Sequence, residues 1–141
     1  MASEAKKHER FTAVATIAAT VISLLALGLS AFTYRETNET QKRIAAFTFW
    51  QSYLELAAEK PEYANGQFNS ADAKDKLAYE WFAANALGAA ETVYLLQIDD
   101  PAWKETIQTL IRNHGNYIKS NEFERKHYDP SFRALIDETL K

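Results

Sequence analysis

The feature that most constrains this chain is a run without charged residues near its N-terminus, "FTAVATIAATVISLLALGLSAFTY", which occupies residues 11–34. A helix of this length rises roughly 36 Å at 1.5 Å per residue, which exceeds a hydrocarbon core of about 30 Å. Aromatic residues lie near both ends, as they do at membrane interfaces. The Thr and Ser hydroxyls inside it can bond to carbonyls one turn back, so they cost little in lipid. The run predicts a transmembrane helix over residues 11–34.

Two alternatives remain open for this run. One is a cleaved secretory signal, because the basic segment 1–10 resembles the start of such a signal and Gly28 and Ser30 offer small residues at possible cleavage positions. The apolar part of a signal is usually about 7–15 residues long, however, and this run continues beyond both positions. The other is a helix buried in a soluble domain, which rarely needs this length without a charge. We therefore expect residues 11–34 to be retained as an anchor.

The sequence predicts a single-pass protein of the cell membrane but leaves its orientation undecided. Equal numbers of basic residues flank the run, and they are Lys6, Lys7 and Arg10 before it and Arg35, Lys42 and Arg43 after it. The N-terminal set lies closer to the run, which slightly favours an N-terminus inside the cell. Because large domains are poorly governed by flanking charges, the side that holds the main domain stays open.

The rest of the chain reads as a helical domain with few breaking points. Only four Gly and three Pro occur in 141 residues, and apolar periodicity predicts helices over about 37–59, 71–98 and 101–119. A fourth, short helix begins at Asp129-Pro130. Asn65-Gly66 predicts a turn after the helix at 37–59, and no Gly or Pro separates that helix from the charge-free run. Ser70, Asp100 and Asp129 are the expected N-caps. The predicted fold is all-α: a short basic tail at 1–10, the transmembrane helix at 11–34, and an aromatic-rich antiparallel bundle of about four helices at 35–141.

The periodicity also predicts which side chains pack in the core. The helix at 37–59 has one apolar sector formed by Ile44, Phe47, Leu54 and Ala58 and broadened by Phe49, Tyr53 and Leu56. The helix at 71–98 is apolar nearly all round, which is typical of a central helix covered on several sides. The Trp residues 50, 81 and 103 recur among other apolar residues, so we expect them to pack in the core rather than to form an aromatic ligand cage.

Motifs for common chemistries are missing. The chain has no Cys, which excludes disulfides and thiolate chemistry, and its net charge of −3 gives no broad electrostatic footprint for nucleic acid. It contains no glycine-rich phosphate loop and no nucleophile elbow. One Glu-x-x-His spacing occurs, from Glu124 to His127, but di-iron sites need two such motifs. We predict no catalytic residue, metal or cofactor, and a surface pair at Glu124 and His127.

Two polar residues stand out on otherwise apolar helix faces. His114 lies at the centre of the apolar stripe of the helix at 101–119, and Glu91 lies between Leu87 and Leu95 of the preceding helix. A buried ionisable group either shifts its pKa or finds a partner, so these two side chains could find each other. Their pairing would be a structural hydrogen bond or, in the functional alternative, a general acid-base pair or ligand site in a pocket.

The charge-free run also carries a stripe of small residues. Read in heptads, one seam of the helix contains Thr12, Thr16, Ala19, Ser23, Ala26, Ser30 and Thr33. Small residues along one seam let helix backbones approach closely in membranes. This small-residue seam is the predicted interface with a protein partner or a second copy of the chain.

These features predict a single-pass, membrane-anchored accessory or scaffold protein that binds a partner protein near the bilayer. Its expected partners are the membrane and either another protein or a second copy, and no nucleic acid is expected. The alternative is a small membrane-tethered enzyme or ligand sensor that uses Glu91 and His114 in a bundle pocket. No family with specific motifs is indicated by these residues.

Overall fold

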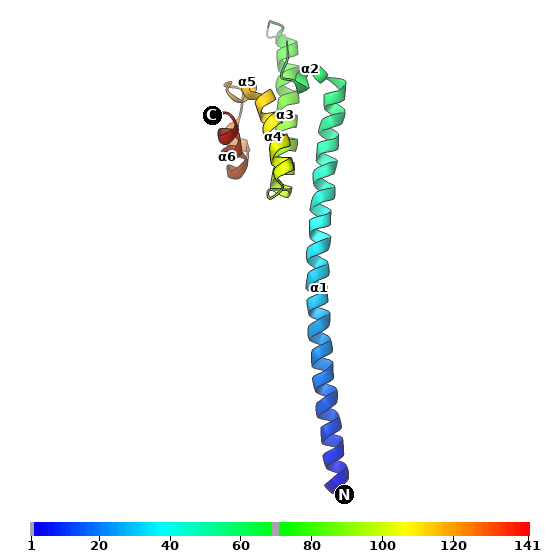
Figure 1. Ribbon diagram of the computed structural model, residues 1–141. Helices are drawn as coiled ribbons and strands as arrows, with labels where there is room; N and C mark the ends of the chain where they lie inside the picture. Colours follow the sequence, from blue (N-terminus) through cyan, green and yellow to red (C-terminus); the bar gives the residue numbers. More distant parts are fainter. Residues whose placement is uncertain (1, 69–70) are drawn as a thin grey trace. The chain divides into compact units, whose positions relative to one another are not determined.

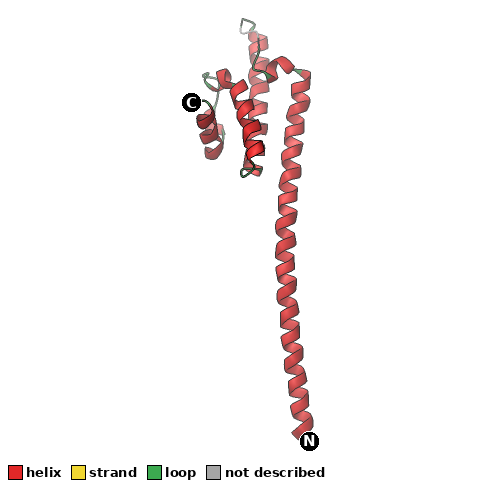
Figure 2. Ribbon diagram, viewed as in Figure 1, coloured by secondary structure: helices red, strands yellow, loops and turns green. Residues whose placement is uncertain are grey.

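The computed structural model describes the backbone of residues 2–68 and 71–141, and the side chains of residues 16, 19–68 and 71–141. Every regular element in these ranges is a helix (Figures 1 and 2). The predicted all-α class and helical bundle are therefore confirmed. The elements in chain order are α1 (Ala2–Glu59), α2 (Pro61–Ala64), α3 (Ala73–Leu96), α4 (Pro101–Asn113), α5 (Gly115–Ile118), the 3-10 helix η1 (Arg125–His127) and α6 (Pro130–Thr139).

The chain divides into two compact units, residues 1–40 and residues 41–141. The first unit consists of the N-terminal part of α1, which continues without a break through residues 35–40, as the lack of Gly and Pro there predicts. All described side chains of this unit are exposed. The large apolar ones are Val21, Ile22, Leu24, Leu25, Leu27, Leu29, Phe32 and Tyr34.

The predicted transmembrane helix is not supported by the described part of the chain. Among the residues whose side chains are described, none of the helices combines the length and the apolar character that a membrane crossing requires. Residues 11–15, 17 and 18 of the predicted span lie outside that description. Within the predicted span, this result therefore applies only to residues 16 and 19–34.

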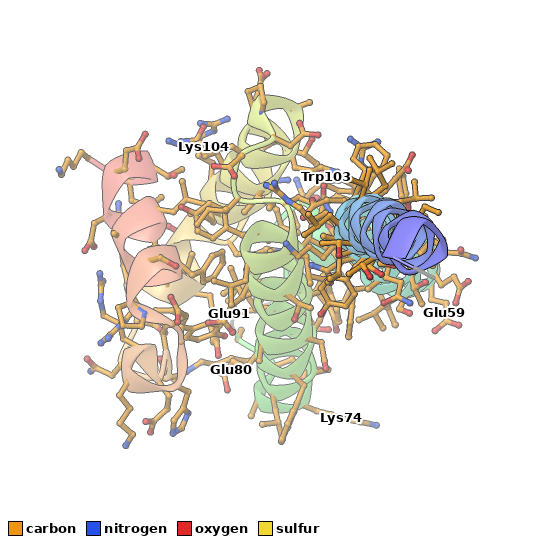
Figure 3. All side chains as sticks on the ribbon, turned by 90° about the horizontal axis from the view of Figure 1, so that it is seen from below. Glu59, Lys74, Glu80, Glu91, Trp103 and Lys104 are labelled. Atoms are coloured by element: carbon orange, nitrogen blue, oxygen red, sulfur yellow. The ribbon has the colours of Figure 1, made fainter. Side chains whose placement is uncertain are left out.

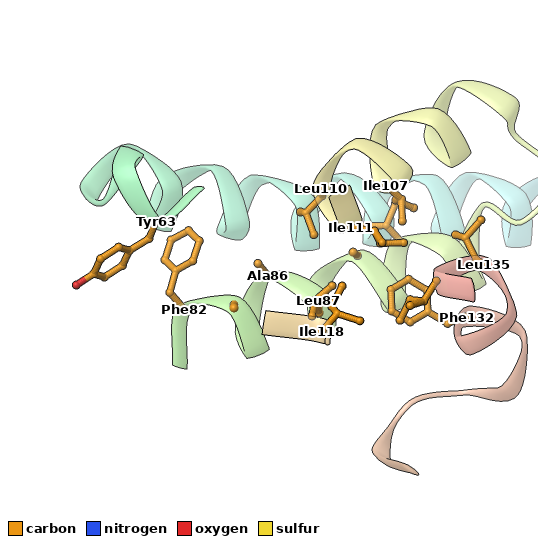
Figure 4. Close-up of a cluster of buried hydrophobic side chains, with 14 of the residues drawn as sticks. Tyr63, Phe82, Ala86, Leu87, Ile107, Leu110, Ile111, Ile118, Phe132 and Leu135 are labelled. Carbon is orange, nitrogen blue, oxygen red and sulfur yellow. The ribbon is translucent and has the colours of Figure 1, made fainter. Parts of the chain in front are cut away.

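The core of the second unit is built around α3, which contacts α2, α4 and α6. Figure 4 shows the apolar side chains that these helices contribute. The largest apolar ones that are fully buried are Tyr79, Leu87, Val93, Ile107, Ile111, Phe132, Leu135 and Ile136. The central position predicted for the helix at 71–98 is confirmed, because three other helices cover it.

Aspartate caps begin three of the helices. The side chain of Asp100 accepts hydrogen bonds from the N–H groups of Ala102 and Trp103, which satisfies donors that have no partner inside α4. Asp129 accepts from Ser131 N–H at the start of α6. Both caps were predicted from the Asp-Pro pairs. At α3 the cap is Asp72, and the predicted cap Ser70 lies outside the described residues.

The C-terminal part of α1 packs on the core through a face that only partly coincides with the predicted apolar sector. Ala46 is fully buried, and Trp50, Tyr53 and Ala57 pack partly against the core. These four positions follow the 4-3-4 spacing of a narrow packing stripe. Ile44, Phe47 and Leu54 were predicted to face the core and are exposed instead. The prediction was right for Tyr53 and Leu56, which pack partly against the core, and wrong for Ile44, Phe47 and Leu54. Apolar residues occur on most sides of this helix, so composition alone did not identify the covered side.

A tight turn after α2 contacts the end of α4. Gly66 has a φ of 72°, in the left-handed region that favours glycine. A Cβ atom there would lie 2.1 Å from the carbonyl oxygen of Asn113. In return, the Asn113 side chain donates a hydrogen bond to the carbonyl of Ala64. The predicted Asn65-Gly66 turn is therefore confirmed. Position 66 needs glycine because its φ is left-handed and because a side chain there would collide with Asn113.

Candidate functional site

His114 occupies the break between α4 and α5. The helix predicted over 101–119 is interrupted there, because His114 ends α4 and α5 starts at Gly115. Its side chain is fully buried, as predicted. Nδ1 lies 3.1 Å from the Tyr79 hydroxyl, and Nε2 is buried without a hydrogen-bond partner. The ring centroids of Tyr79 and Phe82 lie 5.8 and 5.9 Å from that of the imidazole, so two aromatic side chains are among the groups that enclose His114.

This enclosure determines the charge of His114. Burial disfavours the charged imidazolium and lowers the pKa of His114 to about 4. Burial also raises the pKa of the neighbouring Tyr79 to about 12. Both side chains are therefore neutral near pH 7. A neutral, fully buried imidazole therefore lies within hydrogen-bond distance of a neutral phenol.

Glu91 has a different partner. Its Oε1 accepts a hydrogen bond from the backbone N–H of Asp129, the N-cap residue of α6. Figure 3 shows Glu91 on α3. Its carboxylate fixes the start of α6 to α3, while the side chain remains partly buried, as predicted.

Glu91 and His114 do not form the predicted pair. His114 contacts α3 at Tyr79 and Phe82, whereas Glu91 lies nine residues beyond Phe82, roughly 14 Å further along the helix axis. The hydrogen bond of His114 is with Tyr79, and that of Glu91 is with the backbone of Asp129. Sequence position could not reveal this separation, because it depends on where α4 crosses α3.

Only two of the three Trp residues lie together. Trp50 and Trp103 meet edge to face with ring centroids 5.5 Å apart, and both are partly buried against the core (Figure 3 labels Trp103). Trp81 is 68% exposed, which contradicts its predicted core position. The three side chains therefore do not form one aromatic cage. Trp81 instead lies on the side of α3 away from the core.

The small-residue seam of α1 can be followed over its described part. Thr16, Ala19, Ser23, Ala26, Ser30 and Thr33 are all exposed, and Thr12 lies outside the described side chains. The hydroxyl of Ser23 donates to the Ala19 carbonyl at 2.9 Å, which is the bond predicted for a hydroxyl inside an apolar helix. The predicted interface along this stripe remains a prediction.

The Glu-x-x-His spacing lies on the surface, as expected. Glu124 and His127 are both exposed, and the Glu124 carboxylate forms an ion pair with Lys126 at 2.9 Å. Within the described residues, no group of three or more His, Asp or Glu side chains is arranged to hold a metal ion.

A groove between α1 and α3 was not predicted from the sequence. Its volume is about 370 Å³. The α1 wall consists of Phe49, Ser52, Tyr53 and Leu56, and the α3 wall consists of Ala84, Asn85, Gly88, Ala89 and Thr92. The sequence feature that could have indicated this groove is the spacing of small residues at positions 84, 88 and 92, because their short side chains leave space along one face of α3.

Three polar side chains of this groove donate hydrogen bonds within their own helices. Asn85 donates to the Trp81 carbonyl at 2.8 Å, and Thr92 donates to the Gly88 carbonyl at 2.9 Å. Ser52 donates to the Thr48 carbonyl at 3.1 Å. The groove therefore presents small and aromatic surfaces without a charged side chain in its lining, which suits an apolar helix better than a polar metabolite.

No protein-family model, no curated protein and no solved structure matches this chain. The function must therefore be inferred from its own residues.

Proposed function

We propose that this protein is a single-pass, membrane-anchored accessory or scaffold protein whose residues 41–141 bind a helix of another protein. The observation that carries the proposal is the apolar surface that remains exposed on the described helices. It has two parts, the side chains of α1 between Val21 and Tyr34 and the groove between α1 and α3. Exposed apolar surfaces of this extent mark membrane or protein contacts.

The anchor is supported by the direction of the exposed side chains. Leu24, Leu25, Leu27 and Leu29 point to different sides of α1, and their exposed fractions lie between 65% and 69%. A partner helix would cover only one stripe of such a surface, whereas lipid covers all sides. The run from residue 11 to residue 34 is charge-free and is part of one continuous helix. We therefore assign it to the membrane rather than to a coiled coil.

The partner class is inferred from the groove. Ala84 and Gly88 leave room for the backbone of a helix, and Phe49 supplies an exposed aromatic edge. A helix laid into an apolar groove is a recurrent mode of peptide recognition. The alternative, an enzyme or sensor that uses Glu91 and His114 together, has no comparable support because the two side chains bond to different residues.

Extraction of membranes with alkaline carbonate tests the anchor. We expect the full chain to stay in the membrane pellet and the double variant Leu24→Arg/Leu27→Arg to be released, because each central charge costs about 2.5–3.5 kcal/mol in a membrane helix. Ile44→Arg/Leu54→Arg adds the same charges at exposed positions outside the run and should stay in the pellet. An unmodified chain found in the soluble fraction would exclude the anchor.

Photo-crosslinking from the groove tests the partner. A photoreactive residue replacing Asn85 should give one discrete adduct in cells, whereas the same residue replacing exposed Glu105 on α4 should not. Gly88→Leu should abolish the adduct because it fills the groove. This variant should still fold, since a Cβ at Gly88 meets no atom within 4 Å. An adduct that survives Gly88→Leu, or one with twice the mass of the chain, would contradict binding of a separate protein in the groove.

A further inference from the structure

A second pocket, of about 250 Å³, meets the groove at Ala84, which lines both. Its other lining residues are Leu77, Glu80, Trp81, Tyr117 and Glu122. They come from the outer face of α3, from α5 and from the segment after α5. The pocket thus combines two aromatic rings with two carboxylates, a combination that the groove lacks.

Two aromatic side chains line this pocket, the exposed Trp81 and the partly buried Tyr117. Trp81 is 68% exposed, so most of its indole remains available to a ligand. Tyr117 is partly buried and is held edge-on by Tyr79 and Phe123, with ring centroids 6.4 and 5.8 Å away. A positive charge placed over an indole or phenol face is attracted by the ring quadrupole.

The carboxylates already bind one ammonium group. Lys76 Nζ lies 2.8 Å from Glu122 Oε1 and 3.5 Å from Glu80 Oε1. The two carboxylates outnumber this single ammonium, so the cluster keeps a formal charge of −1. The negative potential reaches the pocket wall: burial raises the pKa of Tyr117, and the charges of Glu80 and Glu122 raise it further.

We propose that this pocket binds one arginine side chain of the partner protein whose helix occupies the groove, an inference that rests on the proposed function. Three properties of arginine fit the lining. Its flat guanidinium can stack on the exposed Trp81 indole, and its fork of N–H donors can bond to a carboxylate of Glu80 or Glu122. Its charge balances the cluster. The partner's helix would then carry small or apolar residues along the groove and an arginine near Ala84.

Nuclear magnetic resonance of the full chain in a nonionic detergent tests this assignment. The three Trp residues give three indole N–H signals, and Trp81→Phe identifies the one from Trp81. N-acetyl-arginine amide should shift the Trp81 signal saturably and leave those of Trp50 and Trp103 in place. N-acetyl-citrulline amide, which has nearly the same shape and no charge, should not shift it.

A matched pair of charge variants separates the pocket from general electrostatics. Glu80→Gln/Glu122→Gln should weaken binding of the arginine probe about five- to tenfold, as expected for the loss of two partly exposed ion pairs. Glu105→Gln/Glu138→Gln makes the same change in net charge, and Glu138 pairs with Lys104 much as Glu122 pairs with Lys76. This control should bind the probe with unchanged affinity.

Several outcomes would overturn the assignment. Equal shifts with the citrulline probe would mean that stacking suffices, and equal weakening in the control would mean that the net charge suffices. Tighter binding of tetramethylammonium than of the arginine probe would make the ligand a free organic ammonium. The Asn85 crosslink distinguishes this inference from the proposed function: an adduct lost in Gly88→Leu but kept at full yield in Glu80→Gln/Glu122→Gln would reject the pocket and retain the groove.

Discussion

Residues 19–34 of α1 and helix α3 share several apolar residue types, but only α3 buries a leucine completely. Both contain several Ala and Leu residues and one Gly. Leu25 in α1 is 69% exposed, whereas Leu87 in α3 is fully buried. Covering a leucine side chain is worth about 1.5–3 kcal/mol, so the two helices differ greatly in how much apolar surface the fold covers. Residue type therefore does not decide burial; the presence of covering helices does.

The largest expected effect is the difference between truncating a buried leucine in α3 and truncating an exposed leucine in α1. Leu87→Ala should lower the free energy of unfolding by about 2–5 kcal/mol, because it leaves a cavity in the core. Leu25→Ala should leave the unfolding midpoint of the bundle unchanged. Urea titration of the full chain in nonionic detergent measures both, since Trp50, Trp81 and Trp103 all lie in the second unit. A comparable loss in Leu25→Ala would mean that both regions share one packed core.

A smaller effect should follow from acidification, and it should be confined to the bundle. The pKa of His114 falls from 6.5 to about 4 on folding, so the unfolded chain binds the proton more readily. The folded state therefore has its full stability above pH 6.5, where His114 is neutral in both states, and loses stability as the pH falls towards 4. By pH 5 the free energy of unfolding should have dropped by about 2 kcal/mol.

Urea titrations between pH 7 and pH 5 check this dependence. His114→Gln serves as the control, because it keeps a polar side chain beside Tyr79 and cannot titrate; its stability should vary much less over this range. The carboxylate of Glu122 does not obscure the comparison, because its pKa is about 2 in the folded protein and 4.5 ordinarily, so it stays largely ionised in both states down to pH 5. An equal slope in both proteins would show that His114 is not the group responsible.

Gly66→Ala tests a contact that exists only in the folded bundle. The added Cβ would collide with the Asn113 carbonyl and would require a left-handed backbone, so we expect a loss of about 1–3 kcal/mol. The change in thermal midpoint measures the loss. Asn65→Ala is the control at the neighbouring exposed position and should cost less, because it removes only a surface hydrogen bond to Pro61. Equal losses would place the strain elsewhere in the turn.

The smallest effect should be a gain in stability. Gly28 and Gly88 are both helical, and a Cβ at either meets no atom within 4 Å. Gly88→Ala should stabilise the bundle by about 0.5–1 kcal/mol through helix propensity. Gly28→Ala should leave the midpoint of the bundle unchanged, because residue 28 lies in the other unit. A destabilised Gly88→Ala would indicate that another part of the bundle approaches this face more closely.

Local physical chemistry in the sequence determined the helical class, the Asp100 and Asp129 caps and the Asn65-Gly66 turn. These features depend on a few adjacent residues, which is why they could be predicted. The burial of His114 was also predictable, since its neighbours in the helix are apolar.

Tertiary packing alone decided the rest. Packing of the helices gives Glu91 the backbone of Asp129 as its partner and His114 the hydroxyl of Tyr79. The face of α1 that carries Ala46 and Trp50 is covered because it fits the core closely, although a wider apolar sector was available. Trp81 remains exposed because it lies on a side of α3 that faces away from the core. Local sequence sets which surfaces are apolar, whereas the relative positions of the helices decide which of them are covered.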